Sequence, residues 1–556
     1  MPHGQDAPPG TPPAGTGPPP GRSPLGTGRS GPPWADATAP LGVFPFPGDV
    51  APAPAQPAAP APGPAAPARR RARGTDPVGW LIALAAFAAY ATISVLRYRR
   101  LQPGSWDLGI YTEYIRQIAH LHAPIVPIRQ AGFNLLGDHF QPAVALLAPF
   151  FRVFPSPVTL LVAQALLTAL SVIPVSRAAR ELTGHWVSRA IVAAYAFSWG
   201  LQQLIDFDFH ELAFAVPLLA CSLSALVRGR PRAALWWALP LVFVKEDQGF
   251  TVAVVGVVML GAALGGARGL RARAQPAARR RTWAWAGAAL IGWGLAWSAL
   301  AIMVIIPHFS IAHHYQYWQD GGVIGPGRSF SLAGLLSQLS HAGGEKLATA
   351  VLVLLPVAFL ALASPLVLAV VPTLALRFLS TNGYYWGTGY HYNAVLMPIV
   401  FLAAVDVMAR LGARPHRSRL AVQLPRYAAA LMLLITGWLA IREPLAGLWQ
   451  PQTYAITPHV RAEEAAIARV PSGTTVEATL TMLAPLAARD DTSWVGTVGI
   501  PDPLYLVFDA TNSGWTPLPA ATPLRFLEER HPGTVYQQVF RADGVYVFRR
   551  TWPAAR

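Results

Sequence analysis

The chain has 556 residues, of which 53% are hydrophobic and only 13% charged, and its mean hydropathy is +0.36. Ordinary soluble domains carry about 25% charged residues, so a single soluble globular domain is excluded and an integral membrane protein is indicated. The net charge of +16 is compatible with nucleic acid, anionic lipid or cytoplasmic Arg-rich loops as its cause, and the lone Cys221 excludes intramolecular disulfides and multi-cysteine metal sites.

The first 76 residues are rich in Pro, Gly, Ala and Thr and contain few aliphatic side chains. Such a segment buries too little apolar surface to offset the entropy of ordering, so we predict a disordered cytoplasmic tail over 1–76. An Arg cluster at 69–73 precedes the apolar run 78–96, which is long enough to cross a bilayer. The cluster favours a cytoplasmic N-terminus, although the basic run 97–100 argues for the opposite orientation.

Ten further apolar runs follow and together with 78–96 predict about eleven membrane spans within 77–442. These runs are 157–176, 188–204, 211–227, 232–244, 248–266, 282–306, 347–363, 365–378, 394–409 and 426–442. The runs 232–244 and 365–378 are short for full crossings, so we expect them to tilt, break or form a re-entrant pair.

The distribution of Arg agrees with this segmentation. Counting from a cytoplasmic N-terminus, the predicted inside loops are 177–187, 228–231, 267–281 and 410–425, and they hold most of the loop Arg residues. Spans and sidedness are assigned from different features, so their agreement supports the topology.

The last segment, 443–556, mixes polar and apolar residues and differs from the bundle in kind. Strand-like runs TTVEATL, PLYLVFDA, TVYQQVF and GVYVFRR flank a helical stretch, TPLRFLEERH. We therefore predict a small α/β domain, which the topology count places outside the membrane. The predicted fold is mainly α: a polytopic helix bundle with a disordered tail and this extracytoplasmic α/β domain.

Acidic and His residues gather at the predicted outer edge, whereas the inner edge carries almost only Arg. Ionisable groups beside membrane spans are costly and favour a functional site. The residues at the predicted outer edge are Asp107 and Glu113; Asp138 and His139; Asp206, Asp208, His210 and Glu211; Lys245, Glu246 and Asp247; and His391 with Asn393. Five separate segments on one face predict a site at the mouth of a helix bundle.

The first of these acids, Asp107, precedes IYTEYIRQIAHLHA, whose apolar spacing predicts an amphipathic helix lying on the membrane interface. Its carboxylate is equally suited to cap that helix, to act as a general base toward a hydroxyl, or to hold a metal.

The other motifs leave two interpretations each. Asp206 and Asp208 suit a divalent cation bound with a phosphate, or acids that complement a helix dipole. Lys245 suits an ion pair with Glu246 or Asp247, or contact with an anionic phosphate. The segment GYYWGTGYHYN suits an interfacial aromatic belt, or stacking against a sugar. The segment HFSIAHHYQYW is interpreted as a loop.

Several common chemistries find no motif in the chain. No P-loop, dinucleotide-binding fingerprint, zinc spacing or nucleophile elbow is present in the sequence. The basic residues are not interleaved with aromatic residues, which argues against nucleic acid as a partner.

Five ordered motifs carry a resemblance to a known family: WDLGIYTEYI, GDHFQPAVALLAPF, DFHELAFAVPLLA, KEDQGFTVAVVG and GYHYNAVLMPIVFLAAVD. They resemble the Domain of Unknown Function 2079 family of predicted membrane proteins, which is similar to the GT-C superfamily of multi-span glycosyltransferases. The resemblance implies a lipid-bound enzyme that uses a polyprenyl-phosphate-linked sugar, with Asp107 as the acidic residue of the first external loop. Lys245 or a divalent cation would then neutralise the phosphate.

Two rival classes stay open: a transporter or flippase of a lipid-linked or polar substrate, and a non-catalytic envelope scaffold. The absence of an inverted repeat and the gathering of polar residues at one face favour the transferase. A pocket that joins Asp107, Asp206, Asp208, His210 and Lys245 would support transfer, a gated through-path would support transport, and scattered motifs would support the scaffold.

Overall fold

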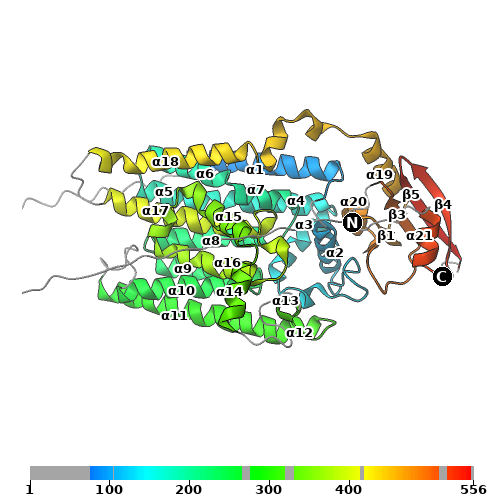
Figure 1. Cartoon of the computed structure of the whole chain (residues 1–556), viewed down its shortest axis with the longest axis horizontal. Helices are drawn as coiled ribbons and strands as arrows, with labels where there is room; N and C mark the ends of the chain where they lie inside the picture. The colour runs from blue at the N-terminus through cyan, green and yellow to red at the C-terminus, as the bar shows by residue number, and fades with distance from the viewer. Residues whose placement is uncertain are drawn as a thin grey trace, which may run out of the picture. The chain divides into compact units, whose positions relative to one another are not determined.

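A computed structural model describes residues 76–103, 106–265, 276–319, 331–413, 419–511 and 523–552. The predicted disordered tail, apart from Asp76, lies outside these residues. The described part of the chain is mainly helical and ends in a small mixed sheet (Figure 1). This agrees with the predicted helix bundle followed by an α/β segment.

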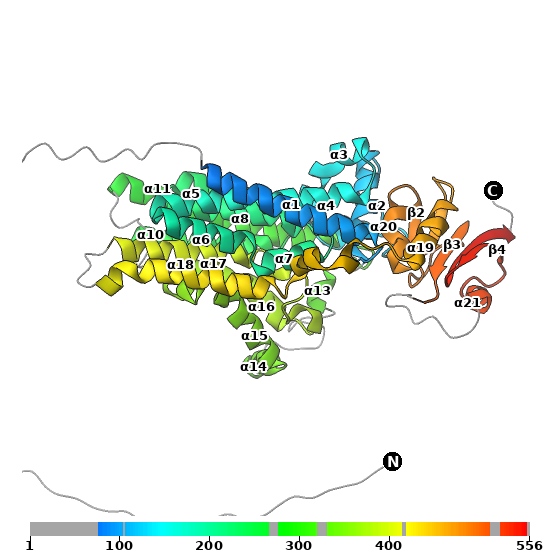
Figure 2. The ribbon, with the colours of Figure 1, turned by 90° about the horizontal axis from the view of Figure 1, so that it is seen from above.

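The bundle contains long helices that run side by side in two perpendicular views (Figures 1 and 2). Its helices are α1 (Pro77–Arg99), α4 (Pro157–Leu170), α5 (Val172–Leu182), α6 (His185–Ala196), α7 (Trp199–Asp206), α8 (Leu212–Val227), α9 (Pro231–Ala238), α10 (Gln248–Leu264), α11 (Ala277–Leu300), α15 (Gly343–Leu354), α16 (Val371–Leu379), α17 (Leu396–Gly412) and α18 (Arg419–Ala440). The shorter helices α2 (Asp107–Ala119), α3 (Ala148–Val153), α12 (Ile306–Phe309), α13 (Gln316–Gln319) and α14 (Leu332–Ser340) lie between them in the chain.

Five helical segments of the described residues are long and apolar enough to cross a membrane. They are Pro77–Arg99, Pro157–Leu182, Ala277–Phe309, His391–Gly412 and Val422–Ala440. The predicted count of about eleven spans is therefore not confirmed. Other predicted runs form shorter apolar helices, among them Leu212–Val227, Gln248–Leu264 and Pro365–Leu379.

Breaks in the helices explain part of the difference. The run 188–204 divides at Phe197–Ser198 into α6 and α7, and the run 232–244 changes from α9 to a 3₁₀ segment, Leu239–Phe243, with Pro240 near its start. Proline lacks the backbone N–H that a continuous helix needs. The expectation that 232–244 is not one simple crossing agrees with this break.

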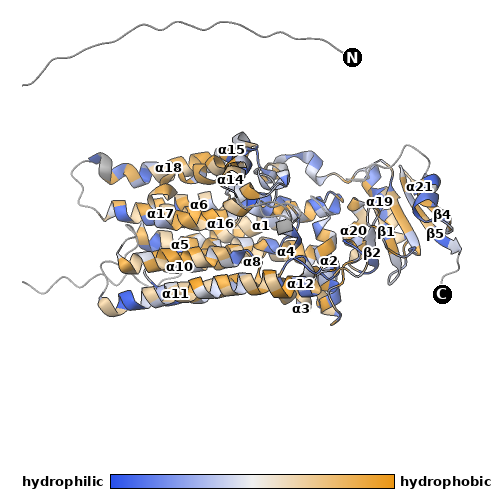
Figure 3. Cartoon of the chain, turned by 60° about the horizontal axis from the view of Figure 1, so that its bottom comes forward, coloured by the Kyte–Doolittle hydropathy of each residue, from blue (hydrophilic) through white to orange (hydrophobic). Residues whose placement is uncertain are grey.

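The helices of the bundle consist largely of hydrophobic residues (Figure 3), and several of the large apolar side chains are exposed. Leu81 is 65% exposed, Trp285 62% and Leu434 70%, each on a helix of spanning length. Water would disfavour so much apolar surface, whereas hydrocarbon would not. The helices are thus suited to a bilayer.

Close packing of α10 on α11 depends on small residues. A Cβ built on Gly287 would lie 2.7 Å from the Gly256 carbonyl oxygen, and one built on Gly294 would meet the backbone of Gly249. Glycine lets the two backbones approach to a distance at which any side chain would collide, as in other membrane helix pairs.

The C-terminal segment forms one five-stranded sheet with the order β2-β1-β3-β5-β4. Its elements are α19 (Pro458–Ala468), β1 (Thr475–Ala478), α20 (Leu480–Ala487), β2 (Asp491–Trp494), β3 (Tyr505–Asp509), α21 (Pro523–Arg530), β4 (Val535–Ala542) and β5 (Val545–Trp552). Strand β1 pairs in parallel with β2 and β3, and β5 pairs antiparallel with β3 and β4. The predicted C-terminal sheet is present; its location outside the membrane stays a prediction.

Helix α2 lies against this segment. The helix was expected from its apolar spacing and is present, but its residues from Leu108 to Ile115 are all buried. Helix α20 packs on it, and the Arg116 guanidinium donates to the Asp491 carboxylate at 2.7 Å. Protein therefore covers its apolar face, and its location at the membrane interface stays a prediction.

The glycine packing yields a matched test on one helix. Gly287→Ala should lower the thermal denaturation midpoint of the purified protein, because overpacking at a tight contact costs about 1–3 kcal/mol. Gly292→Ala is the control, since a Cβ there meets nothing within 4 Å. It should leave the midpoint unchanged or raise it, because Ala favours helix over Gly by about 0.5–1 kcal/mol. Equal midpoints for the two variants would contradict the assigned contact.

Candidate functional site

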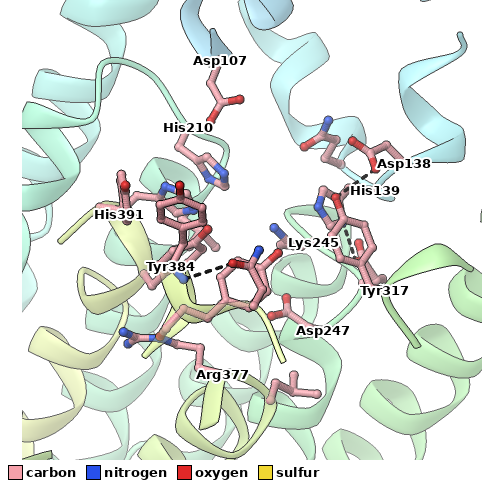
Figure 4. Close-up of a pocket in the computed structure, with 18 of the residues that line it drawn as sticks. Asp107, Asp138, His139, His210, Lys245, Asp247, Tyr317, Arg377, Tyr384 and His391 are labelled. Atoms are coloured by element: carbon pink, nitrogen blue, oxygen red, sulfur yellow. Dashed lines mark hydrogen bonds and ion pairs between the residues drawn. The ribbon is translucent and has the colours of Figure 1, made fainter. Parts of the chain in front are cut away.

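A cavity of about 900 Å³ lies where several chain segments meet at one end of the bundle (Figure 4). Its walls come from the start of α2, the loop 129–141, the segments before α8 and α10, the segment 315–317, the end of α16 and the loop 379–395. The predicted site residues that line it are Asp107, Asp138, His139, His210, Lys245, Glu246, Asp247 and His391. The structure thus brings all five predicted segments to one cavity.

Several of the cavity-lining residues lie just before the first residue of a helix. The cavity residues His210, Asp247 and His391 lie just before α8, α10 and α17. The opposite end of α8 leads to Arg228, which pairs with Glu181 at 2.7 Å. Acidic and His residues therefore occupy one end of α8 and Arg the other, as the charge pattern predicted. Helix starts also present unpaired N–H groups that favour anions.

Glu211 is the buried hub behind one wall of the cavity. Its side chain is fully buried and accepts a hydrogen bond from the Tyr111 hydroxyl. Lys245 Nζ lies 3.0 Å from Oε1, and His210 Nδ1 lies 2.8 Å from Oε2. Glu211 does not line the cavity itself, so it positions Lys245 and His210, which do. Lys245 therefore forms its ion pair with Glu211. One interpretation of the sequence had instead expected an ion pair with Glu246 or Asp247.

Glu246 is a second buried carboxylate with several donors. It accepts hydrogen bonds from the Phe140 backbone N–H at 3.1 Å and the Tyr315 hydroxyl at 2.9 Å, and His139 Nδ1 lies at 2.7 Å. Burial and the charge of Lys245 lower the pKa of His139, but the Glu246 carboxylate together with the charge of Asp138 outweighs both and holds that pKa above its usual value. His139 is thus a cation over a wider pH range than an isolated imidazole.

Asp138 is fixed in the same wall. The Tyr317 hydroxyl donates to its Oδ1 at 3.0 Å, and Arg129 Nη2 lies 3.5 Å from Oδ2. The His139 ring stacks on Tyr317 with centroids 4.5 Å apart. Asp138 and His139 are therefore held by a tyrosine far along the chain.

The loop before α17 supplies an aromatic wall. Tyr384, Tyr385, Tyr390 and Tyr392 all line the cavity. The His391 ring stacks on His210 with centroids 3.3 Å apart. Aromatic faces of this kind suit a sugar ring, one of the two interpretations given for this segment.

Arg377 holds that loop in place. It donates to the carbonyl oxygens of Tyr385 and Gly387, each at 2.7 Å, and to Asn393 Oδ1 at 2.8 Å. Asn393 is fully buried and, like Glu211, lies outside the cavity lining. Its place is behind the wall, where it orients Arg377.

Asp107 is the first residue of α2 and lines the cavity. The N-cap position belongs to Trp106, whose side chain makes no capping hydrogen bond, and Asp107 is the acidic residue of the first turn. The interpretation of Asp107 as a cap is therefore wrong. Figure 4 shows its carboxyl group directed into the cavity on the side of His210.

Asp206 and Asp208 lie apart from the cavity lining. Asp206 forms an ion pair with Arg97, and the charge of Asp208 also acts on Arg97. Asp208 has a left-handed backbone, with φ of 71°, and its carbonyl accepts from Gln164. These contacts join the acids to the end of α1, and their role as metal ligands stays a prediction.

Several lining residues escaped the sequence interpretation. Tyr111, Arg129, Tyr315, Tyr317 and Arg377 contact the predicted residues from the cavity wall. Tyr315 and Tyr317 gave no periodic sign in the sequence, because Tyr317 lies in the short helix α13 and Tyr315 just before it. Arg377, an ionisable residue inside a predicted apolar run, was a usable sign.

Comparison with known proteins identifies the family. Residues 97–499 match the family described as "Predicted membrane protein (DUF2079)", and the chain belongs to that family. The class of protein is thus a membrane protein, as its apolar helices indicate. No curated protein matches the sequence.

Solved structures show only weak similarity. ArnT from Cupriavidus metallidurans in the apo state is 14% identical with a TM-score of 0.46, over 85% of this chain and 98% of that chain. The same protein bound to undecaprenyl phosphate is 12% identical with a TM-score of 0.43, over 86% and 100%. The apo Archaeoglobus fulgidus oligosaccharyltransferase is 14% identical with a TM-score of 0.37, over 74% of this chain and 64% of that chain. This chain thus spans less than two thirds of the archaeal protein, and similarities at this level carry no conclusion about function.

The Glu211 hub generates a stability test. Glu211→Gln removes the charge that faces Lys245 and His210, and breaking a buried ion pair costs about 3–5 kcal/mol. We expect a lower denaturation midpoint, measured by tryptophan fluorescence in detergent. Glu528→Gln, the same change at an exposed position, should leave the midpoint unchanged. A wild-type midpoint for Glu211→Gln would show that the hub does not hold the wall together.

Proposed function

We propose that this protein is a membrane glycosyltransferase that moves a sugar from a polyprenyl phosphate to a hydroxyl acceptor. The observation that carries the proposal is the cavity that joins Asp107, Lys245 and a wall of tyrosines at one end of an apolar bundle. A carboxylate, a cation and aromatic faces are the groups that such a transfer needs. The five motifs resemble the DUF2079 family, and the similarity of that family to the GT-C superfamily supports the same assignment.

Lys245 would hold the phosphate of the donor. An ammonium group carries three donors, and the ion pair with Glu211 satisfies one of them. Lys245 also lines the cavity, so its other protons are available to a ligand there. Glu211 keeps the ammonium in place without occupying the cavity. Protonated His139 adds positive potential nearby.

Asp107 would act on the acceptor. Its carboxylate takes the proton of the acceptor hydroxyl while that oxygen attacks the anomeric carbon. The new glycosidic bond forms as the bond between the anomeric carbon and the phosphate oxygen breaks. Polyprenyl phosphate leaves with the bonding electrons, and Lys245 stabilises the charge that develops on it.

The lipid tail needs an apolar path beside the phosphate. Leu212, Leu376 and Leu379 form apolar parts of the cavity lining, and Leu376 is 40% exposed. A prenyl chain laid against α16 would bury this surface, with a gain of about 25 cal/mol per Å². Membrane lipids and a lipid-linked donor are thus the proposed partners, and a divalent cation stays the proposed cofactor.

In the direct test, purified protein in nanodiscs is incubated with a panel of polyprenyl-phosphate sugars and hydroxyl acceptors. The products are identified by mass spectrometry. Asp107→Asn should reduce product formation by about 10²–10⁴-fold, the usual contribution of a general base. Glu528→Gln, a carboxylate-to-amide change at an exposed position of α21 away from the cavity lining, should retain activity. A chelator arm reports whether a divalent cation takes part.

Two results would contradict the transferase proposal. Full activity of Asp107→Asn would exclude that residue as the base. Movement of intact donor across proteoliposomes without a new glycosidic product would instead identify a flippase.

The cavity end of the bundle is proposed to face the outside of the cell. Cys221 is the sole cysteine of the chain, so Cys221→Ser provides a background for site-specific labelling. Leu121, 91% exposed after α2, would become Leu121→Cys, and Arg230, exposed at the far end of α8, would become Arg230→Cys. A membrane-impermeant maleimide on intact cells should label only the first variant. Labelling of only the second would reverse the orientation.

A further inference from the structure

A cluster of three ligand-type side chains lies in the C-terminal segment, away from the cavity. His459 and Glu463 are four residues apart on α19 and share one face of that helix, and Asp509 ends β3. One ligand atom from each lies within 4.8 Å of the others. Among the residues that the structure describes, it is the one His, Cys, Asp or Glu group with this geometry. We propose that His459, Glu463 and Asp509 bind a divalent transition-metal ion of the zinc class.

The first support is the orientation of the His459 ring. Nε2 faces the cluster and lies 2.9 Å from Asp509 Oδ2. Nδ1 faces the opposite way, 3.0 Å from the Asp543 carbonyl oxygen and 3.3 Å from its carboxylate. Metal-binding histidines characteristically present one nitrogen to the ion and donate the other to a carboxylate or a carbonyl. Asp543 thus supplies the group that orients His459.

The second support is an unsatisfied carboxylate oxygen. Glu463 is 2% exposed, and its Oε1 is buried without a hydrogen-bond partner among the described residues. The Thr481 hydroxyl interacts with this carboxyl group, but its oxygen is likewise without a partner in hydrogen-bond geometry among the described residues. Burying an unpaired carboxylate oxygen is costly, and a coordinated cation removes that cost.

An ion pair between His459 and Asp509, without a bound cation, explains the positions of these two side chains but not that of Glu463. The proton on His459 Nε2 satisfies Asp509, whose other oxygen already accepts from the Thr511 N–H at 2.8 Å and its hydroxyl at 2.7 Å. Glu463 Oε1 gains nothing from that pair. A cation at the centre of the cluster engages all three side chains at once.

The ligand chemistry defines the ion. One imidazole nitrogen and two carboxylate oxygens suit zinc, with bonds of about 2.0–2.2 Å. Ligand atoms of a tetrahedral site are then about 3.3 Å apart, close to the 2.9 Å between His459 and Asp509. The His459 side chain is 26% exposed, which leaves a route for water or a further ligand to a fourth position.

The test uses full-length protein purified with a tag that lacks histidine and stripped with a chelator. Zn²⁺ is titrated by calorimetry, and Co²⁺ replaces it as a spectroscopic probe. We expect one ion per chain, visible d–d absorption of Co²⁺ and a higher denaturation midpoint with Zn²⁺. Glu463→Gln should weaken Zn²⁺ affinity by more than about 100-fold, and Asp543→Asn by about 10–100-fold.

The neighbouring residue provides the control. Glu464 is exposed on the same helix, so Glu464→Gln should bind Zn²⁺ like the wild type. Glu463→Gln also removes a buried charge, so its metal-free form should fold at least as well as the wild type. Absence of stoichiometric binding in the wild type, or unchanged affinity in Glu463→Gln, would overturn the proposal. None of these readouts depends on glycosyl transfer, so the two proposals stand or fall separately.

Discussion

A carboxylate removed from water must be matched by donors, and Glu211 imposes this requirement on the cavity. Its oxygens contact Tyr111 from α2, Lys245 from the segment before α10 and His210 beside it in the chain. His210 in turn stacks on His391 before α17. Four separated segments are thereby drawn to one place. The partners of this buried charge thus come from the same segments that form part of the cavity wall.

The same constraint separates two kinds of residue in the site. Glu211 and Asn393 lie behind the wall, where their polar atoms contact Lys245 and Arg377, and they give the wall its shape. Asp107 and Lys245 line the space that the wall encloses. Such a division suits a site in which reacting groups must be held still by partners that do not themselves touch the ligand. The metal cluster on α19 and β3 follows the same logic, with Asp543 behind His459.

Much of the site followed from the cost of charge beside apolar helices. Asp107, Asp138, His139 and Lys245 stood out in the sequence because ionisable groups next to spans are rare, and all four line the cavity. The ion-pair partner of Lys245 could not be predicted from the sequence, because its contact with Glu211 depends on how the helices pack. Tyr317 was missed for the same reason, because its partner Asp138 is distant along the chain, and Glu463 was missed because Asp509 on β3 completes its cluster.

The sequence by itself determined the class of fold: composition and apolar periodicity require a helix bundle in a membrane, and strand-like runs require a C-terminal sheet. It did not determine how many helices span, since proline breaks such as Pro240 and tertiary contacts decide where each apolar run ends. Only the tertiary structure shows that α20 packs on α2, that Asp206 forms an ion pair with Arg97, and that His459 faces Asp509. The local pattern of apolar residues indicates which surfaces are buried. Long-range packing decides which other segment of the chain covers each of those surfaces.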